Sequence, residues 1–61
     1  MVDFTVENQG SLVVFWANAP EGAQWFEDNT DVLHWGNGYV VEHRYACLIA
    51  DALSDEGFSL E

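Results

Sequence analysis

The fold is decided by residues 2–16, which read VDFTVENQGSLVVFW. Residues 2–7 alternate between apolar and polar, and the apolar positions are β-branched or aromatic, which is typical of a half-buried strand. This alternation predicts that Val2, Phe4 and Val6 face inward. Residues 8–10 supply turn chemistry, and residues 11–16 form an apolar run suited to a central strand. The stretch therefore predicts a β-hairpin.

Two helices are predicted further along the chain. Pro20 and Glu21 suit the first turn of a helix that should run from Pro20 to about Asn29. Gly22 weakens this helix by about 1 kcal/mol relative to alanine, so we expect it to depend on docking to the sheet. A second helix is predicted from His43 to about Glu56, ending at a glycine cap. Its apolar stripe, together with Phe15 and Trp16, predicts the core, and the members of the stripe are Tyr45, Leu48, Ile49, Ala52 and Leu53.

The segment between the helices permits two interpretations. Residues 33–42 fit either a second tight hairpin or an irregular segment that ends in one good strand, Tyr39 to Glu42, and we favour the single strand. The expected fold is then one α+β domain spanning residues 1–61. It has an antiparallel three-stranded sheet packed with one or two helices, in the order β-β-α-β-α.

The charge balance restricts the partners. The chain has eleven Asp and Glu, one Arg and no Lys, for a net charge of −10. Nucleic-acid binding depends on Lys and Arg, so we expect no direct contact with nucleic acid and instead a basic partner. The hydrophobic content of 49% predicts a folded chain rather than an acidic disordered tail. No segment predicts a membrane span, and the single cysteine, Cys47, fits a reducing cytosol.

Catalytic and metal chemistry are not favoured. No nucleophile elbow is present, and we expect neither an enzyme nor a cofactor. Glu42, His43 and Cys47 superficially resemble a set of metal ligands, but a cysteine on a helix flank is usually a small apolar filler, so no metal site is predicted. Arg44 is expected to pair with Glu42 or another nearby carboxylate. Leu60-Glu61 fits a cloning remnant, and no role is assigned to it.

The acidic residues are placed against local helix rules. Acids stabilise helix N-termini, yet several of these lie in last turns, where each opposes the helix dipole by about 0.3–1 kcal/mol. Two pairs spaced i, i+4, Asp51 with Asp55 and Glu27 with Asp31 if the first helix extends that far, add like-charge repulsion. Such placement predicts a binding surface that imitates phosphates. The predicted contact carboxylates are Glu21, Glu27, Asp28, Asp31, Asp51, Asp55 and Glu56, with Trp25 as a candidate aromatic anchor.

Several segments together resemble a known class of proteins. They are the opening Phe4 to Asn8 with residues 10–12, the mid-chain Trp25, the segment Val41 to Tyr45, and Gly57-Phe58. With the size and charge, this pattern resembles small acidic anti-CRISPR proteins encoded by phages, and in particular an inhibitor of a type I-C system. The resemblance implies a monomeric double-stranded DNA mimic in the bacterial cytoplasm. It would bind the basic PAM-recognition groove on the large subunit of the Cascade complex.

A different interpretation remains open. The chain also fits a small phage accessory or antitoxin-like module that binds another protein through an aromatic patch. Trp25, Trp35 and Tyr39 are the residues that such a patch would contain. Binding through the patch would depend little on salt, whereas binding through carboxylates would weaken steeply as salt rises.

Overall fold

The computed structural model describes residues 2–61, and its N-terminal hairpin is the one predicted from the sequence. Strand β1 (Phe4–Gln9) pairs antiparallel with β2 (Leu12–Ala17), from Phe4 opposite Ala17 to Gln9 opposite Leu12. Gly10 takes a left-handed φ of 79° in the turn, and its backbone N–H donates to Asn8 Oδ1 at 2.9 Å. A side chain would be strained at this φ, which explains the glycine.

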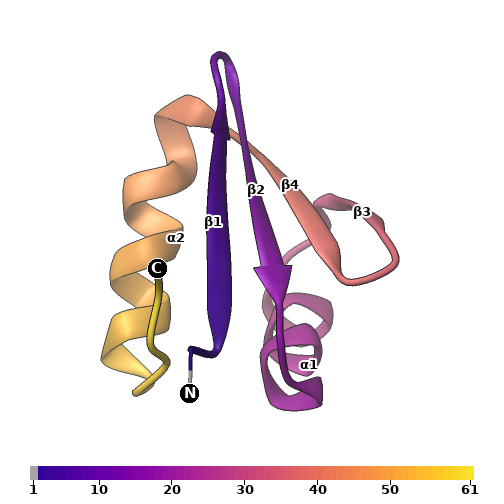
Figure 1. Cartoon of the computed structure of the whole chain (residues 1–61), viewed down its shortest axis with the longest axis vertical. Coiled ribbons are helices and arrows are strands. Elements are labelled where there is room, and N and C mark those ends of the chain that lie inside the picture. Colours follow the sequence, from indigo (N-terminus) through magenta and orange to yellow (C-terminus); the bar gives the residue numbers. More distant parts are fainter. Residues whose placement is uncertain (1) are drawn as a thin grey trace.

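The sheet has four antiparallel strands in the order β1-β2-β4-β3, so the favoured three-stranded interpretation is wrong (Figure 1). Strand β3 (Leu33–Trp35) and β4 (Gly38–Glu42) form a second tight hairpin, and the element order becomes β-β-α-β-β-α. Gly36 turns the chain with a φ of 57°. Asn37 holds this turn against β2, because its Nδ2 donates to the Ala17 carbonyl at 2.6 Å and its carbonyl accepts from Ala17 N–H at 2.8 Å.

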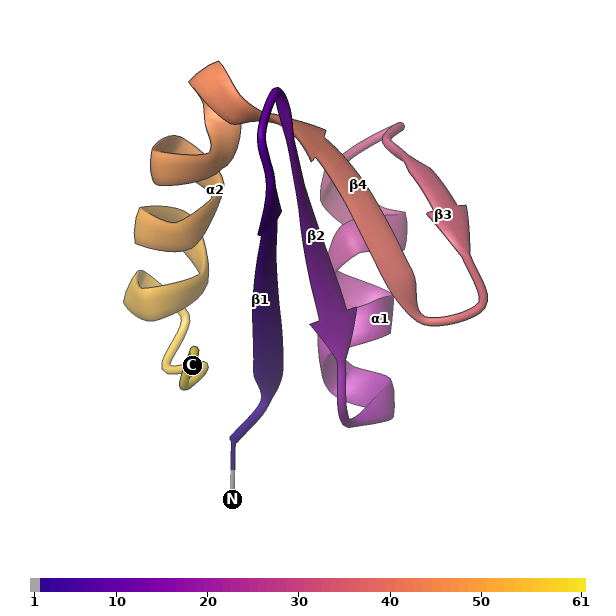
Figure 2. The same ribbon diagram turned by 45° about the horizontal axis from the view of Figure 1, so that its top comes forward.

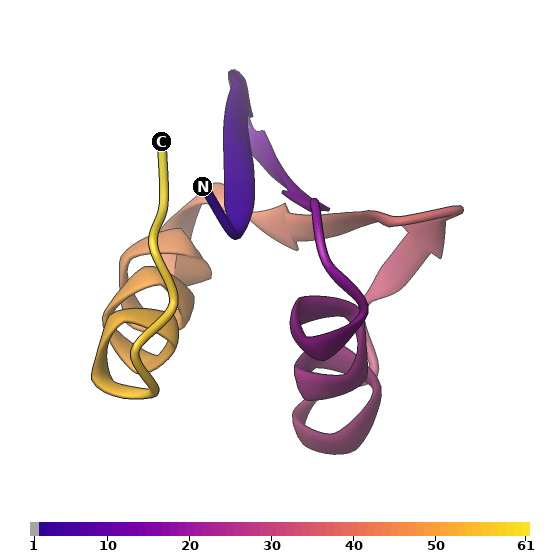
Figure 3. The same ribbon diagram turned by 60° about the horizontal axis from the view of Figure 1, so that its bottom comes forward.

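Both predicted helices are present. Helix α1 (Pro20–Asn29) has the predicted bounds, and α2 (His43–Asp55) ends one residue earlier than expected, with Glu56 as its C-cap. Gly57 follows with a φ of 95°. The two helices lie on the same side of the sheet and leave its other side bare, as two further views show (Figures 2 and 3).

The core lies between this sheet face and the helices. Phe4, Phe15, Phe26 and Leu53 are fully buried, and Tyr39 stacks on Phe26 with ring centroids 4.5 Å apart. The prediction that Phe4 and Val6 of β1 face inward is confirmed. Phe4 is fully buried, and Val6 is half-buried and packs against the core. Aromatic rings supply much of the buried volume that so short a chain needs.

The last residues belong to the fold rather than to a passive tail. Leu60 forms a parallel bridge with Phe4, and the Glu61 N–H donates to the Phe4 carbonyl at 3.0 Å. The Asp3 carboxylate accepts the Ser59 N–H at 2.9 Å. These bonds cover part of the outer edge of β1, and Leu60 packs against the core.

The core prediction for α2 is only partly correct. Leu53 is buried and Ile49 packs against the core, but Tyr45 is 46% exposed and Leu48 is 67% exposed. The apolar stripe of α2 is wider than the surface that the sheet offers it, because α1 and α2 stand apart (Figure 3). Trp16 also differs from the prediction, since it lies half-buried on the bare side of the sheet.

Candidate functional site

All seven carboxylates predicted to contact a basic partner belong to exposed residues. They are Glu21, Glu27, Asp28, Asp31, Asp51, Asp55 and Glu56. Exposure is the minimum that such a role requires, because a charge-assisted hydrogen bond to a partner needs an accessible oxygen.

On α1, two of these acids share the outward stripe. Glu21 and Asp28 are seven residues apart, so two helical turns bring them to the same side at about 10.5 Å along the axis. Gln24 lies between them, and its Nε2 donates to Asp28 Oδ1 at 2.9 Å. The buried residues of the helix, Gly22 and Phe26, form the opposite stripe. This geometry directs Glu21 and Asp28 away from the core.

The other two acids of this region lie apart from that stripe. Burial raises the pKa of Tyr39, and the negative charge of Glu27 raises it further, so the Glu27 carboxylate acts on this phenol. The Tyr39 hydroxyl donates to the Ala23 carbonyl at 3.4 Å. Asp31 lies outside the helix, because α1 ends at Asn29 and its C-cap is extended. The i, i+4 pair of Glu27 and Asp31 was expected only if the helix extended to Asp31, so this pair is not formed.

On α2, the predicted pair of like charges is present. Asp51 and Asp55 both lie within the helix at i, i+4 and share one face, with about 5–6 Å between their Cβ atoms. Glu56 is the C-cap, and the last turn contains no basic residue. These acids oppose the helix dipole, as the sequence predicts.

The seven predicted contact carboxylates form two acidic rows, and the arrangement of the helices decides how these rows relate. The first row is Glu21, Glu27, Asp28 and Asp31, and the second is Asp51, Asp55 and Glu56. Since α1 and α2 lie on the same side of the sheet, both rows belong to the helical layer of the molecule (Figure 3). Seven of the eleven carboxylic residues in the chain lie within these helices or within two residues of their C-terminal ends. The helical side therefore carries most of the negative charge.

The single arginine has a partner within the chain. Arg44 Nη2 lies 3.5 Å from Glu42 Oε2, and the two side chains are 70% and 59% exposed. The guanidinium also lies 4.9 Å from the centre of the Tyr45 ring. The predicted pairing of Arg44 with Glu42 is confirmed. An exposed pair of this kind contributes about 0–1 kcal/mol to stability, so it leaves the acidic surface largely uncompensated.

The predicted aromatic patch does not form. Tyr39 is only 3% exposed and stacked in the core, whereas Trp35 is 74% exposed. Trp25 is half-buried against the core, with its ring edge-on to Phe26 at 5.2 Å. Trp25 is therefore neither a fully exposed anchor nor a fully buried core residue.

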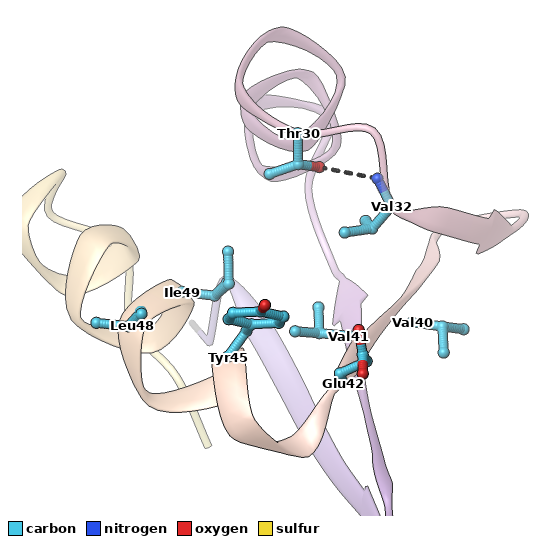
Figure 4. Close-up of a pocket in the computed structure, with 8 residues that line it drawn as sticks. All are labelled: Thr30, Val32, Val40, Val41, Glu42, Tyr45, Leu48 and Ile49. Carbon is cyan, nitrogen blue, oxygen red and sulfur yellow. Dashed lines mark hydrogen bonds between the residues drawn. The ribbon is translucent and has the colours of Figure 1, made fainter.

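An apolar groove between α2, β4 and the segment after α1 was not predicted. It has a volume of about 450 Å³ and is lined by Thr30, Val32, Val40, Val41, Glu42, Tyr45, Leu48 and Ile49. Tyr45 and Ile49 point from α2 toward the space in front of Val41, and Thr30 and Val32 face them from the segment after α1 (Figure 4). Val32 N–H lies 3.5 Å from Thr30 Oγ1 across this wall. Periodicity identified Tyr45 and Leu48 as apolar but assigned them to the core.

A second apolar surface covers the bare side of the sheet. Trp16 lies across Gly38, where a Cβ would come within 2.7 Å of the indole ring. Its Nε1 donates to Glu7 Oε1 at 3.1 Å. Leu33, which lines the same hollow from β3, is 70% exposed. The hollow on this side is lined by Gln9, Leu12, Val14, Trp16, Leu33, Trp35, Gly38 and Val40.

Clusters of metal-ligand residues and helices that could span a membrane were both sought in the described part of the chain. Within residues 2–61, no three His, Cys, Asp or Glu residues are close enough together to hold a metal ion, and Cys47 is exposed. Neither helix in this range is sufficiently long and apolar to cross a membrane.

Comparison with known proteins found no family model, no curated protein and no solved structure that matches this chain.

Proposed function

We propose that this protein inhibits a basic nucleic-acid-binding protein by occupying its nucleic-acid site. The observation that carries the proposal is the concentration of exposed carboxylates on two helices of the same layer, in a chain of net charge −10. Carboxylates accept charge-assisted hydrogen bonds from Arg and Lys as phosphates do. Such a surface attracts a groove that is already built to bind phosphates.

The spacing of the acids supports imitation of a nucleic-acid strand. Base pairs rise by about 3.4 Å, so the separation of about 10.5 Å between Glu21 and Asp28 corresponds to about three base pairs along one strand. Asp51 and Asp55 are about 6 Å apart along the axis of α2, which corresponds to about two base pairs. Neither of these two pairs depends on a loop, because each of the four residues lies within a helix.

The resemblance to small acidic anti-CRISPR proteins suggests the target. We propose the large subunit of a type I Cascade complex, with the basic groove that recognises the PAM duplex as the binding site. In this mechanism the carboxylates of α1 and α2 contact the Arg and Lys residues that would otherwise neutralise DNA phosphates. Target DNA is then excluded by direct competition.

The test is a competition assay with purified Cascade and PAM-containing DNA at low and moderate salt. The double variant Asp51→Asn/Asp55→Asn and the double variant Glu21→Gln/Asp28→Asn each raise the net charge by two. A matched control, Gln9→Lys/Ser11→Lys, raises it equally at the hairpin turn, which contacts the first residue of α2 but contains none of the seven predicted contact carboxylates. We expect wild type and control to displace DNA, the helix variants to require at least tenfold more protein, and displacement to weaken as salt rises.

Two results would count against the proposal. If the wild type leaves DNA bound at stoichiometric excess, the Cascade target is wrong. If the control loses as much competition as the helix variants, net charge rather than the helical rows is responsible. Circular dichroism of each variant confirms that the fold is retained.

A further inference from the structure

The groove between α2, β4 and the segment after α1 leaves apolar side chains in water on the acidic side of the molecule. Tyr45 is 46% exposed and Leu48 is 67% exposed, although helical periodicity marks both as core residues. Contiguous exposed apolar surface of this kind commonly marks an interaction site. Ile49 and Val41 continue the same surface inward to the core.

One acidic residue lines this groove, and two others are close in the chain to residues that line it. Asp31 lies between Thr30 and Val32, two residues that form one wall. Asp51 lies one helical turn after Leu48 on the other wall. Glu42 lines the groove itself, and it is paired with Arg44. An apolar centre with a charged rim is the usual composition of a protein-binding surface.

The bare side of the sheet differs in charge. None of the eight residues that line its hollow is charged, and the adjacent Glu7 carboxylate already accepts hydrogen bonds from Trp16 Nε1 and Gln9 Nε2. A surface whose neighbouring carboxylate is already hydrogen-bonded within the chain attracts a basic partner less than the groove, which offers contact with both the apolar and the cationic parts of such a partner. Charge complementarity therefore favours the groove as the place where a basic protein docks.

We propose that the groove receives apolar side chains from the basic partner, with flanking Lys or Arg residues of that partner on Asp31 and Asp51. This inference rests on the proposed function and deepens it, since it makes the partner's contact surface amphipathic rather than purely cationic. Tyr45 and Leu48 are the anchors. Their burial supplies the affinity that remains when salt screens the carboxylates.

A titration with two synthetic peptides tests the chemistry of the groove directly. One is an amphipathic helix-forming peptide of Lys and Leu, and the other has Ser in place of Leu with the same length and charge. At moderate salt we expect the Lys/Leu peptide to bind wild type at least tenfold more tightly, which corresponds to about 1.4 kcal/mol. Nuclear magnetic resonance shifts should change at Tyr45 and Leu48.

Leu33→Ser provides a matched control for Leu48→Ser, because the two leucines are 70% and 67% exposed on opposite sides of the sheet. We expect Leu48→Ser and Tyr45→Ser to remove the preference for the Lys/Leu peptide and Leu33→Ser to retain it. Equal affinity of wild type for both peptides would overturn the inference. Loss of the preference in Leu33→Ser but not in Leu48→Ser would also overturn it, and would assign docking to the bare sheet face.

The same variants in the Cascade assay separate the two proposals. If wild type displaces DNA and Leu48→Ser displaces it equally well, the mimicry stands and the groove is not used. If the peptide preference is observed but wild type does not displace DNA, the groove docks a basic amphipathic partner and the Cascade target is wrong. Tenfold weaker displacement by Leu48→Ser, with unchanged salt dependence, supports both.

Discussion

Substitution of Gly22 by alanine separates what a helix prefers from what this core permits. Helix propensity alone predicts that Gly22→Ala stabilises α1 by about 0.8–1.0 kcal/mol. In the structure, however, a Cβ at this position would lie 2.6 Å from Phe4 Cζ and 2.9 Å from Phe4 Cε2. Carbon atoms normally approach to about 3.5–4.0 Å, so the ring would have to move.

The Phe4 ring has little room to move. Its side chain is 0% exposed, and edge-on contacts with Phe26 at 5.7 Å and Phe58 at 5.5 Å confine it. Overpacking of a well-packed core costs about 1–3 kcal/mol. After subtraction of the helix gain, we expect Gly22→Ala to lower the free energy of unfolding by about 1 kcal/mol.

Urea unfolding followed by tryptophan fluorescence measures this change. With an m-value of about 1 kcal/mol/M for so small a domain, the midpoint should fall by about 1 M. Net stability in this size class is only about 3–5 kcal/mol, so a destabilised variant has little folded baseline before urea is added. All variants are therefore unfolded in the same fixed concentration of trimethylamine oxide, which stabilises the folded state. Comparison of Gln24→Ala with Gln24→Gly, at an exposed position of α1, measures the helix propensity without the steric contact.

The same substitution in a Phe4→Leu variant tests whether the Phe4 ring is the cause of the destabilisation. Phe4→Leu removes the ring atoms that the new methyl group would meet, so Gly22→Ala should become stabilising by up to about 1 kcal/mol in that background. A higher urea midpoint for Gly22→Ala in the wild-type background would refute the steric argument. So would the same change in stability in both backgrounds.

Three further predictions concern the core, the pH dependence and the acidic rows. Leu53→Ala should cost about 2–5 kcal/mol because this side chain is fully buried, whereas Leu48→Ala should cost under about 1 kcal/mol, and equal losses in urea unfolding would contradict the exposed groove. Burial raises the pKa of Tyr39 and so favours its neutral form in the folded state; the contribution of this group to stability should stay constant below about pH 10 and fall above it, and Tyr39→Phe should flatten this fall in unfolding measured at alkaline pH. Asp55→Asn should raise the thermal midpoint, by about 0.3–1 kcal/mol in stability, because it removes a negative charge from the C-terminal turn of α2 and its repulsion with Asp51; an unchanged or lower midpoint would argue against an energetic cost of this acidic row.

Local sequence signals were sufficient for the individual elements. The alternation in residues 2–7 and the glycine turn predicted the first hairpin, and Pro20 and Gly57 marked helix boundaries that the structure confirms to within one residue. These features depend on contacts between residues close in sequence, where side-chain period and backbone preference act directly. The pairing of β3 with β4 was harder to predict because the hairpin depends on Asn37, whose side chain bonds to Ala17 twenty residues earlier.

The candidate site shows the same division. Composition alone established the charge of −10 and the basic character expected of a partner, and helical spacing placed Asp51 and Asp55 on one face. Whether the acidic rows belong to one layer depended on both helices packing on the same sheet face. The exposure of Tyr45 and Leu48 likewise depended on the separation of α1 from α2. Periodicity reports that a side chain is apolar, but burial requires an opposing surface, and only the tertiary structure determines where that surface ends.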